Sequence, residues 1–348
     1  MTRPFSAGAE RRLLLVTQPE RIPQSQIYPF HHYASDLGRI HGAEIREADL
    51  AAVMSGADTP AKGATVVAFQ TPFDISDDDL LRLVGRLRSD HPGARLGCLD
   101  WFAPTDLRNA ARMDPLVDFY VKKHVFRDRD RYGQPTLGDT NLTDFYGRRF
   151  GLDDTERCFT VPAGFLDKLV VGPSFATAPQ ILPALLGVPP SEGARPFDLH
   201  ARFEVNGTEW YRAMRGEAMT ALERLGDLSI LHGQNVPLSR FMWEMRRSKV
   251  CFSPFGYGEV CWRDYEAVAA GAVLLKPEMS HVETDPDIFI PWETYVPLAW
   301  DLSDFEEKTR KLVVSEDLRR RIAGQAFGML RDWLRSDAFA HNMKPVFG

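Results

Sequence analysis

Residues 253–276 read SPFGYGEVCWRDYEAVAAGAVLLK, the most informative segment of the chain. It has the pattern of a strand end, a loop with Gly256 and Gly258, a helix, and then Gly271 before another apolar strand. In an open α/β sheet, ligands bind beyond the carboxyl ends of the strands, and the free N–H groups and dipole of a helix N-terminus attract anions. The two glycines let a phosphate approach the backbone. The segment therefore predicts an anion-binding loop at a sheet edge.

Three charged residues follow this loop at helical spacing. Glu259, Arg263 and Glu266 are four and three residues apart, so they project from one face of the helix. A cation near the positive end of a helix is disfavoured by roughly 0.3 to 1 kcal/mol, and Arg263 therefore favours an anionic partner such as a diphosphate. The alternative is that Arg263 pairs with a neighbouring carboxylate, that of Glu259, Asp264 or Glu266.

Short apolar strands alternate with helices on both sides of this segment, which is typical of mostly parallel sheets covered on both faces. Pro, Gly and Ser gather in Gly187–Pro196, which predicts a linker. We expect an α/β fold of two Rossmann-like domains, residues 1–190 and 191–334, and a tail, 335–348. The expected elements include strands Arg11–Thr17, Ala64–Gln70, Arg95–Asp100, Phe197–Phe203, Leu228–His232, Val250–Pro254 and Ala272–Lys276, a helix around His32–His41 and a last helix, Ser315–Leu334.

Composition narrows the class of protein. The chain has 348 residues, 44% hydrophobic and 26% charged, with a net charge of −6, which disfavours a nucleic-acid partner. The four cysteines have no metal-ligand spacing and indicate a reducing, cytoplasmic location. The longest apolar run, Ala267–Leu275, is too short to cross a bilayer, so we expect at most peripheral membrane association.

Ser253–Gly271 resembles the donor half of GT-B glycosyltransferases, in particular the exostosin-like and family 1-like C-terminal domains. The shared pattern is Ser-Pro, a Gly-rich turn and an Arg-x-x-Glu-Ala helix that ends in Ala-Gly. It falls here on Ser253, Pro254, Gly256–Gly258, Arg263, Glu266, Ala267, Ala270 and Gly271. The resemblance implies an N-terminal acceptor-binding domain, a C-terminal nucleotide-sugar-binding domain and a last helix that crosses back to the N-terminal domain.

The same resemblance implies roles for single residues. Glu266 would bind the ribose hydroxyls of the nucleotide, and Arg263 would hold the diphosphate. Retaining members carry a second glutamate eight positions earlier, where this chain has Gly258, with Glu259 one residue later. Glu259 is therefore a catalytic candidate, and retention or inversion at the sugar stays open.

Further candidates line the expected cleft. Tyr257 belongs to the glycine loop, and His232 and Gly233 follow a strand where relatives hold the nucleotide base; His232 could also be an ordinary loop histidine. Lys276 could contact phosphate or be a solvated strand-end lysine. His281 and Glu283 follow the same strand and could touch the donor sugar.

The acceptor side offers a possible general base. His31, His32 and Asp36 follow the first strand, where inverting GT-B enzymes place this base, and a histidine suits proton transfer near neutral pH. The alternative is that both histidines only begin a helix. Asp100 and Asp106, near the end of the third expected strand, are rival bases.

The favoured function is therefore a glycosyltransferase of polysaccharide biosynthesis, with a nucleotide-sugar donor, a glycan or lipid-linked acceptor and no metal or other cofactor. One alternative is a nucleotide-sugar epimerase of the same architecture, and another is a non-catalytic nucleotide-sugar-binding protein. An NAD-dependent dehydrogenase is disfavoured, because Gln18-Pro19-Glu20 replaces the glycine-rich turn that a dinucleotide needs.

Overall fold

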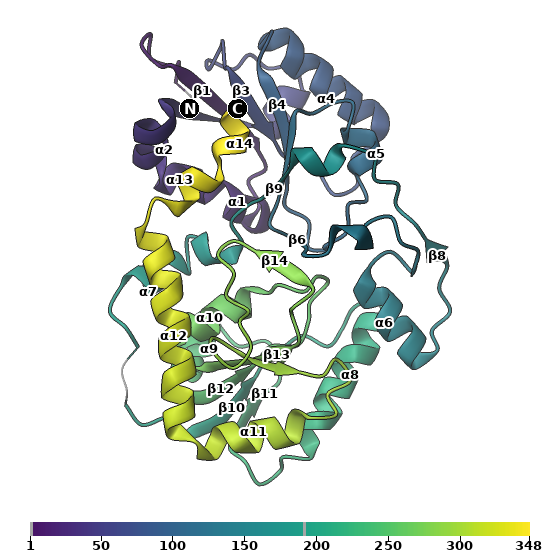
Figure 1. The fold of residues 1–348 in the computed structure, drawn as a ribbon, viewed down its shortest axis with the longest axis vertical. Helices are drawn as coiled ribbons and strands as arrows, with labels where there is room; N and C mark the ends of the chain where they lie inside the picture. The colour runs from purple at the N-terminus through teal and green to yellow at the C-terminus, as the bar shows by residue number, and fades with distance from the viewer. Residues whose placement is uncertain (1–2, 191–192) are drawn as a thin grey trace.

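The computed structural model describes residues 3–190 and 193–348, and it has two α/β halves stacked one above the other (Figure 1). Each half is built on a parallel sheet with helices on both faces, so the expected α/β fold of two Rossmann-like halves is confirmed. The predicted domain boundary lies between residues 190 and 191, and residues 191 and 192 are outside the described part of the chain. The exact domain bounds stay a prediction.

The N-terminal half contains a six-stranded sheet of order β2-β1-β3-β4-β5-β9. Its strands are β1 (Arg11–Thr17), β2 (Ala43–Asp49), β3 (Val66–Phe69), β4 (Arg95–Asp100), β5 (Phe119–Lys122) and β9 (Leu169–Val171). Its helices are α1 (Arg21–His32), α2 (Ala34–His41), α3 (Leu50–Met54), α4 (Asp77–Asp90) and α5 (Ala110–Met113). Two further helices of this stretch of sequence, α6 (Asn141–Phe150) and α7 (Leu182–Leu186), pack against the C-terminal half. Fully buried runs such as Leu13–Val16 explain why these strands take the sheet interior.

Short elements of this half extend toward the other one. They are β6 (His124–Phe126), β7 (Thr136–Leu137), β8 (Glu156–Arg157) and the 3-10 turns η1 (Arg129–Arg131), η2 (Phe165–Lys168) and η3 (Phe175–Thr177). The helix expected around His32–His41 is in fact two helices, because α1 begins eleven residues earlier at Arg21 and Tyr33 separates it from α2.

The C-terminal half contains a five-stranded sheet of order β11-β10-β12-β13-β15. Its strands are β10 (Phe197–Ala201), β11 (Ile230–His232), β12 (Ser248–Phe252), β13 (Val273–Pro277) and β15 (Val296–Leu298). Its helices are α8 (Glu209–Glu223), α9 (Leu238–Arg246), α10 (Trp262–Ala270), α11 (Phe305–Val314) and α12 (Glu316–Arg335). Within the described ranges no helix is both long enough and apolar enough to cross a membrane.

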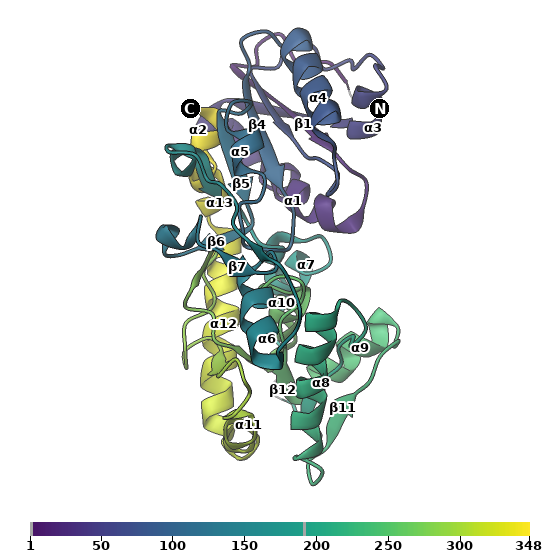
Figure 2. The same ribbon diagram turned by 90° about the vertical axis from the view of Figure 1, so that its right-hand side faces the viewer.

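The two halves are joined at several places. β14 (Val282–Thr284) pairs antiparallel with β6, and α6 lies beside α8 (Figure 2). After α12 the chain returns to the N-terminal half, where α13 (Ala338–Asn342) and α14 (Lys344–Phe347) lie near α2 (Figure 1). Phe339 is fully buried against Phe30 and Tyr33, and the Nε2 of His41 lies 2.7 Å from the carbonyl oxygen of Ala340. The tail is therefore part of the N-terminal core.

Candidate active site

Helix α10 is held at the carboxyl end of β12 by a buried carboxylate. Asp264 accepts hydrogen bonds from the Oγ of Ser253 at 2.6 Å and from the backbone N–H of Cys261 at 2.8 Å. The Nζ of Lys276 lies 3.1 Å from Asp264, and both side chains are fully buried. Lys276 is therefore neither a solvated strand-end lysine nor free to contact phosphate, because its ammonium group is buried against Asp264 inside the domain.

Arg263 has no carboxylate partner. Across residues 3–190 and 193–348 its guanidinium makes no salt bridge or side-chain hydrogen bond, and its Nε is buried without a partner. The alternative in which Arg263 pairs with Glu259, Asp264 or Glu266 is thus not what the structure shows. A buried N–H group without a partner is costly, and an anionic ligand at Arg263 would remove that cost.

Two more basic groups lie near Arg263, on α8 and β10. Burial, and then the charge of Arg263, lower the pKa of Arg215 to about 10. The same two causes lower the pKa of His200 to about 3, so its imidazole is neutral, and neither of its ring nitrogens has a hydrogen-bond partner. The carboxyl edge of β10 and β12 is therefore an electropositive region with unused donors.

Glu266 lies on the side of α10 that faces the other half. Its side chain is 7% exposed, and burial raises its pKa, an effect that the nearby Arg263 and Arg21 oppose. Arg21 is the first residue of α1, and its guanidinium carbon lies 5.0 Å from the ring centre of Trp262. A cavity of about 540 Å³ opens here, lined in part by Arg21, Trp101 and Trp262. Glu266 itself does not line this cavity, whose wall is formed in part by the neighbouring Trp262.

The glycine loop contacts both halves. A Cβ atom on Gly258 would lie 1.9 Å from the carbonyl oxygen of Ala103, so only glycine fits there. Gly256 donates its N–H to the carbonyl of Gly258 at 3.0 Å and closes the turn. Tyr257 is 46% exposed and stacks on Tyr211 with ring centres 4.6 Å apart. The loop is thus packed between the domains with one aromatic ring open to solvent.

His232 and Gly233 lie at the end of the edge strand β11, on the same edge as Arg263. His232 is exposed, and its carbonyl accepts a hydrogen bond from Arg202 at 2.7 Å. Gly233 has a φ of 93°, a conformation that favours glycine. The hydrogen bond from Arg202 fixes the backbone at His232, and the guanidinium of Arg202 also forms an ion pair with Glu244.

Glu259 is surrounded by groups from both halves. It is fully buried and accepts a hydrogen bond from the hydroxyl of Thr105. The Nε2 atoms of His281 and His124 lie 3.6 and 3.8 Å from its carboxylate oxygens. Burial alone would raise its pKa, but His281, His124 and Thr105 lower it to about 2, so Glu259 is ionised. Its Oε1 and both ring nitrogens of His281 have no hydrogen-bond partner within the described part of the chain.

The sequence suggests that Glu283 touches the donor sugar, but in the structure its carboxylate is engaged elsewhere. Its carboxylate forms an ion pair with Arg129 at 2.7 Å, and its strand, β14, pairs with β6 of the N-terminal half. Glu283 therefore ties the two halves together.

The candidate bases of the N-terminal half lie away from Arg263 and Glu266. Helix α1 approaches Glu266 through Arg21 at its start, whereas His31 and His32 end it, about 15 Å further along at 1.5 Å per residue. His31 lies 2.8 Å from Glu47, and Asp36 forms an ion pair with Arg39 at 3.0 Å. The structure therefore does not bring His31, His32 and Asp36 to the edge of the C-terminal sheet where Arg263 and Glu266 lie.

The rival bases are also engaged. Asp100 forms a buried ion pair with Lys122 at 2.8 Å and accepts a hydrogen bond from the hydroxyl of Tyr120 at 2.7 Å. Asp106 pairs with Arg108 at 2.7 Å. Neither carboxylate is available as a base.

Several residues of the site were not singled out in the sequence. His200 and Arg202 stand at the carboxyl end of an expected strand, a signal that could have found them. Arg21, His124 and Arg215 reach the site only through the tertiary fold. Among residues 3–190 and 193–348, no group of three or more His, Cys, Asp or Glu side chains has the arrangement of a metal site.

Comparisons with known proteins agree with this architecture. Residues 193–344 match the family model described as glycosyl transferase-like. An alpha-glucosyltransferase solved with UDP and a 13-mer DNA is similar to 93% of this chain and 95% of its own, with 9% identity and a TM-score of 0.54. The same kind of enzyme with UDP-glucose and DNA containing an abasic site is similar over 94% and 95%, with 8% identity and a TM-score of 0.51.

No curated protein matches the sequence. At such low identity the solved structures show the fold alone, whereas the family model concerns the domain that carries Arg263 and Glu266. The C-terminal part of the chain is thus similar to glycosyl transferase-like proteins, and the whole chain has the GT-B fold expected from the sequence.

Proposed function

We propose that this chain transfers a sugar from a nucleoside diphosphate sugar to a hydroxyl of a glycan or lipid-linked acceptor. The observation that carries the proposal is the unpaired guanidinium of Arg263, beside the buried Arg215 and the unpartnered His200. A diphosphate would supply the missing negative charge. Glu266, with its mostly buried carboxylate, would accept hydrogen bonds from the ribose hydroxyls.

The nucleotide is proposed to be uridine diphosphate. This rests on the solved structures with the same fold, which are complexes with UDP and UDP-glucose. The nucleotide base would lie near His232 and Gly233, at the outer end of the same sheet edge.

The leaving diphosphate is proposed to be stabilised by the protein without a metal. Arg263 and the first turn of α8, which begins at Glu209 near Tyr257, are positive where charge grows on the departing phosphate. Fixed positive groups of this kind lower the barrier because they need no rearrangement during the reaction.

On the acceptor side we propose His281 as the general base. Its ring nitrogens have no hydrogen-bond partner in the described ranges, and Glu259 can stabilise the imidazolium that forms. The acceptor proton would move to His281, the acceptor oxygen would bond to the sugar carbon, and the bond from that carbon to the diphosphate would break. Such a direct displacement inverts the configuration at the sugar.

The four cysteines are all free, which supports a reducing, cytoplasmic location for this reaction. The net charge of −6 disfavours a nucleic-acid acceptor, although the two solved structures contain DNA.

The proposal is tested with purified protein, a panel of nucleotide sugars and neutral or acidic oligosaccharide acceptors, with and without EDTA. Transfer is expected to need both substrates, to release nucleoside diphosphate and to persist in EDTA. A change of the sugar without an acceptor would indicate an epimerase instead. Binding without turnover across the whole panel would indicate a non-catalytic binding protein.

A further inference from the structure

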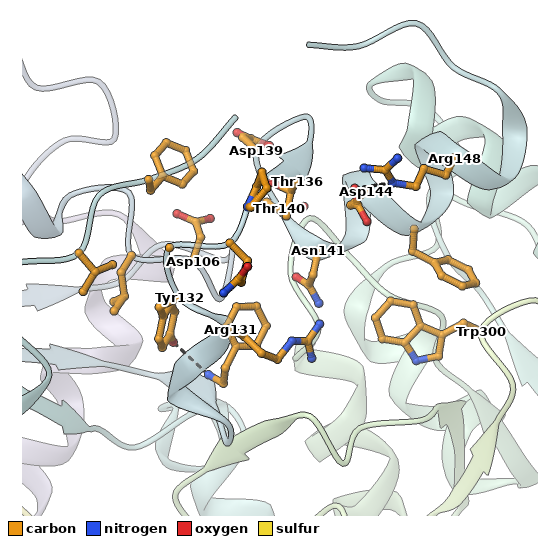
Figure 3. Close-up of a pocket in the computed structure, with 18 of the residues that line it drawn as sticks. Asp106, Arg131, Tyr132, Thr136, Asp139, Thr140, Asn141, Asp144, Arg148 and Trp300 are labelled. Atoms are coloured by element: carbon orange, nitrogen blue, oxygen red, sulfur yellow. Dashed lines mark hydrogen bonds and ion pairs between the residues drawn. The ribbon is translucent and has the colours of Figure 1, made fainter. Parts of the chain in front are cut away.

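A pocket of about 690 Å³ lies between the short elements that follow β5 and helix α6, and none of the residues assigned above lines it except Asp106. The rings of Tyr132 and Phe159 come from the N-terminal half, and Trp300 comes from the C-terminal half. Figure 3 shows Asn141 and the guanidinium of Arg131 pointing toward one another between Tyr132 and Trp300. The pocket combines aromatic walls with polar groups in its middle.

Asn141 supplies unused hydrogen-bonding capacity. Both amide atoms, Oδ1 and Nδ2, are buried and have no hydrogen-bond partner among the described residues. A buried amide without partners is costly, and a ligand with both donors and acceptors would offset that cost. Sugar hydroxyls are such groups, and the C–H faces of a pyranose ring suit aromatic walls.

Most charged groups at the pocket are held in ion pairs, but Arg131 is not. Asp106 and Asp139 share Arg108, Asp144 pairs with Arg148 at 2.8 Å, and Arg149 pairs with Glu217 at 2.6 Å. Arg131 has no acidic partner within residues 3–190 and 193–348, and its guanidinium carbon lies 4.6 Å from the ring centre of Phe126. The cluster of Asp106, Asp139 and Arg108 keeps one negative charge, whereas Arg131 is the lining arginine that has no acidic partner among the described residues and is free to pair with an anion.

The pocket is also next to the proposed base. The ring centre of His281 lies 5.1 Å from that of Trp300 and 6.3 Å from that of Phe126, and both of these aromatic residues line the pocket. A glycan unit bound here could extend past Trp300 toward His281.

We propose that this pocket binds an anionic pyranose unit of the acceptor, a sugar ring that carries a carboxylate or a phosphate. The acceptor role rests on the proposed function, but binding of the sugar does not. Arg131 pairs with the anionic group, Asn141 bonds to ring hydroxyls, and the aromatic walls cover the ring.

Binding is measured by saturation-transfer NMR and calorimetry with three probes: methyl β-D-glucopyranosiduronic acid, glucose 6-phosphate and methyl β-D-glucopyranoside. The wild type is expected to bind at least one anionic probe more tightly than the neutral glucoside. Arg131→Gln should weaken anionic probes about tenfold or more and leave the neutral one unchanged, since hydrogen bonds to charged groups are the stronger ones. Which of the two anionic probes binds more tightly shows whether the pocket prefers a carboxylate or a phosphate.

Asn141→Ala should weaken all three probes, and Arg82→Gln, on the exposed surface of α4, serves as the matched control and should change none. UDP affinity is measured in parallel and should be the same in every variant. The proposal is overturned if no probe binds the wild type, or if anionic and neutral probes bind equally and Arg131→Gln changes neither. Failure of the wild type to bind UDP would contradict the proposed function but not this site.

Discussion

Gly258 of the glycine loop lies directly against Ala103 of the N-terminal half. A Cβ atom on this glycine would come within 1.9 Å of the carbonyl oxygen of Ala103. The loop that precedes α10 is therefore positioned by the N-terminal half as well as by its own sheet. This contact lies one residue from Glu259, whose carboxylate also contacts both halves.

Gly258→Ala is expected to push the two halves apart and to lower transfer at least tenfold. The clash is with backbone, which cannot move aside as a flexible side chain would. Turnover and small-angle scattering check the effect. Gly85→Ala, a helical glycine of α4 with free space around it, is the control and should be neutral or stabilising by up to about 1 kcal/mol. Equal activity of Gly258→Ala and Gly85→Ala would contradict the role of the contact.

Glu266→Gln is expected to weaken UDP binding while pyrophosphate binding stays nearly unchanged, because only UDP offers ribose hydroxyls to this side chain. Calorimetric titration with UDP and with pyrophosphate measures the change in affinity for each ligand. Equal losses for UDP and pyrophosphate would mean that Glu266 acts only by orienting Arg263.

The fold could be predicted from the sequence to the extent that its strands are short apolar runs, as in Arg11–Thr17. Strand β2 (AEIREAD) lies at the edge of the sheet, and its apolar residues are interspersed with polar ones. It is therefore not an apolar run and could not be predicted in this way. Arg263 and Glu266 stood out because helical spacing and a family pattern coincide there. Arg21 and His124 could not be found this way, since only the docking of the two halves brings them to α10.

The ionised Glu259 should make stability depend on acid pH. Its folded-state pKa, about 2, is below the ordinary value of 4.5, so its contribution is present above pH 4.5 and is lost as the pH falls toward 2. Glu259→Gln is expected to be less stable than the wild type at pH 7 by roughly 3 kcal/mol, from about 1.4 kcal/mol per pKa unit. Urea unfolding at pH 7, 4 and 3 should show this difference shrinking, and a difference that is constant with pH would contradict the assignment.

The C-terminal tail should contribute strongly to the N-terminal core. Phe339→Ala removes a fully buried ring that contacts Phe30 and Tyr33, and the expected loss is about 3 to 5 kcal/mol of unfolding free energy. Val314→Ala, at a position 80% exposed, is the matched control and should change stability by less than about 0.5 kcal/mol. Similar unfolding midpoints for the two variants would show that the tail is not part of this core.

The most direct test of the donor site is calorimetric titration of UDP into the wild type, Arg263→Ala and the control Arg246→Ala, an exposed arginine at the end of α9. The unpaired guanidinium of Arg263 predicts a loss of about 1.5 to 3 kcal/mol for Arg263→Ala, the range for a hydrogen bond to a charged group, and none for Arg246→Ala. Unchanged UDP affinity in a folded Arg263→Ala protein would contradict the assignment of the diphosphate site to this helix.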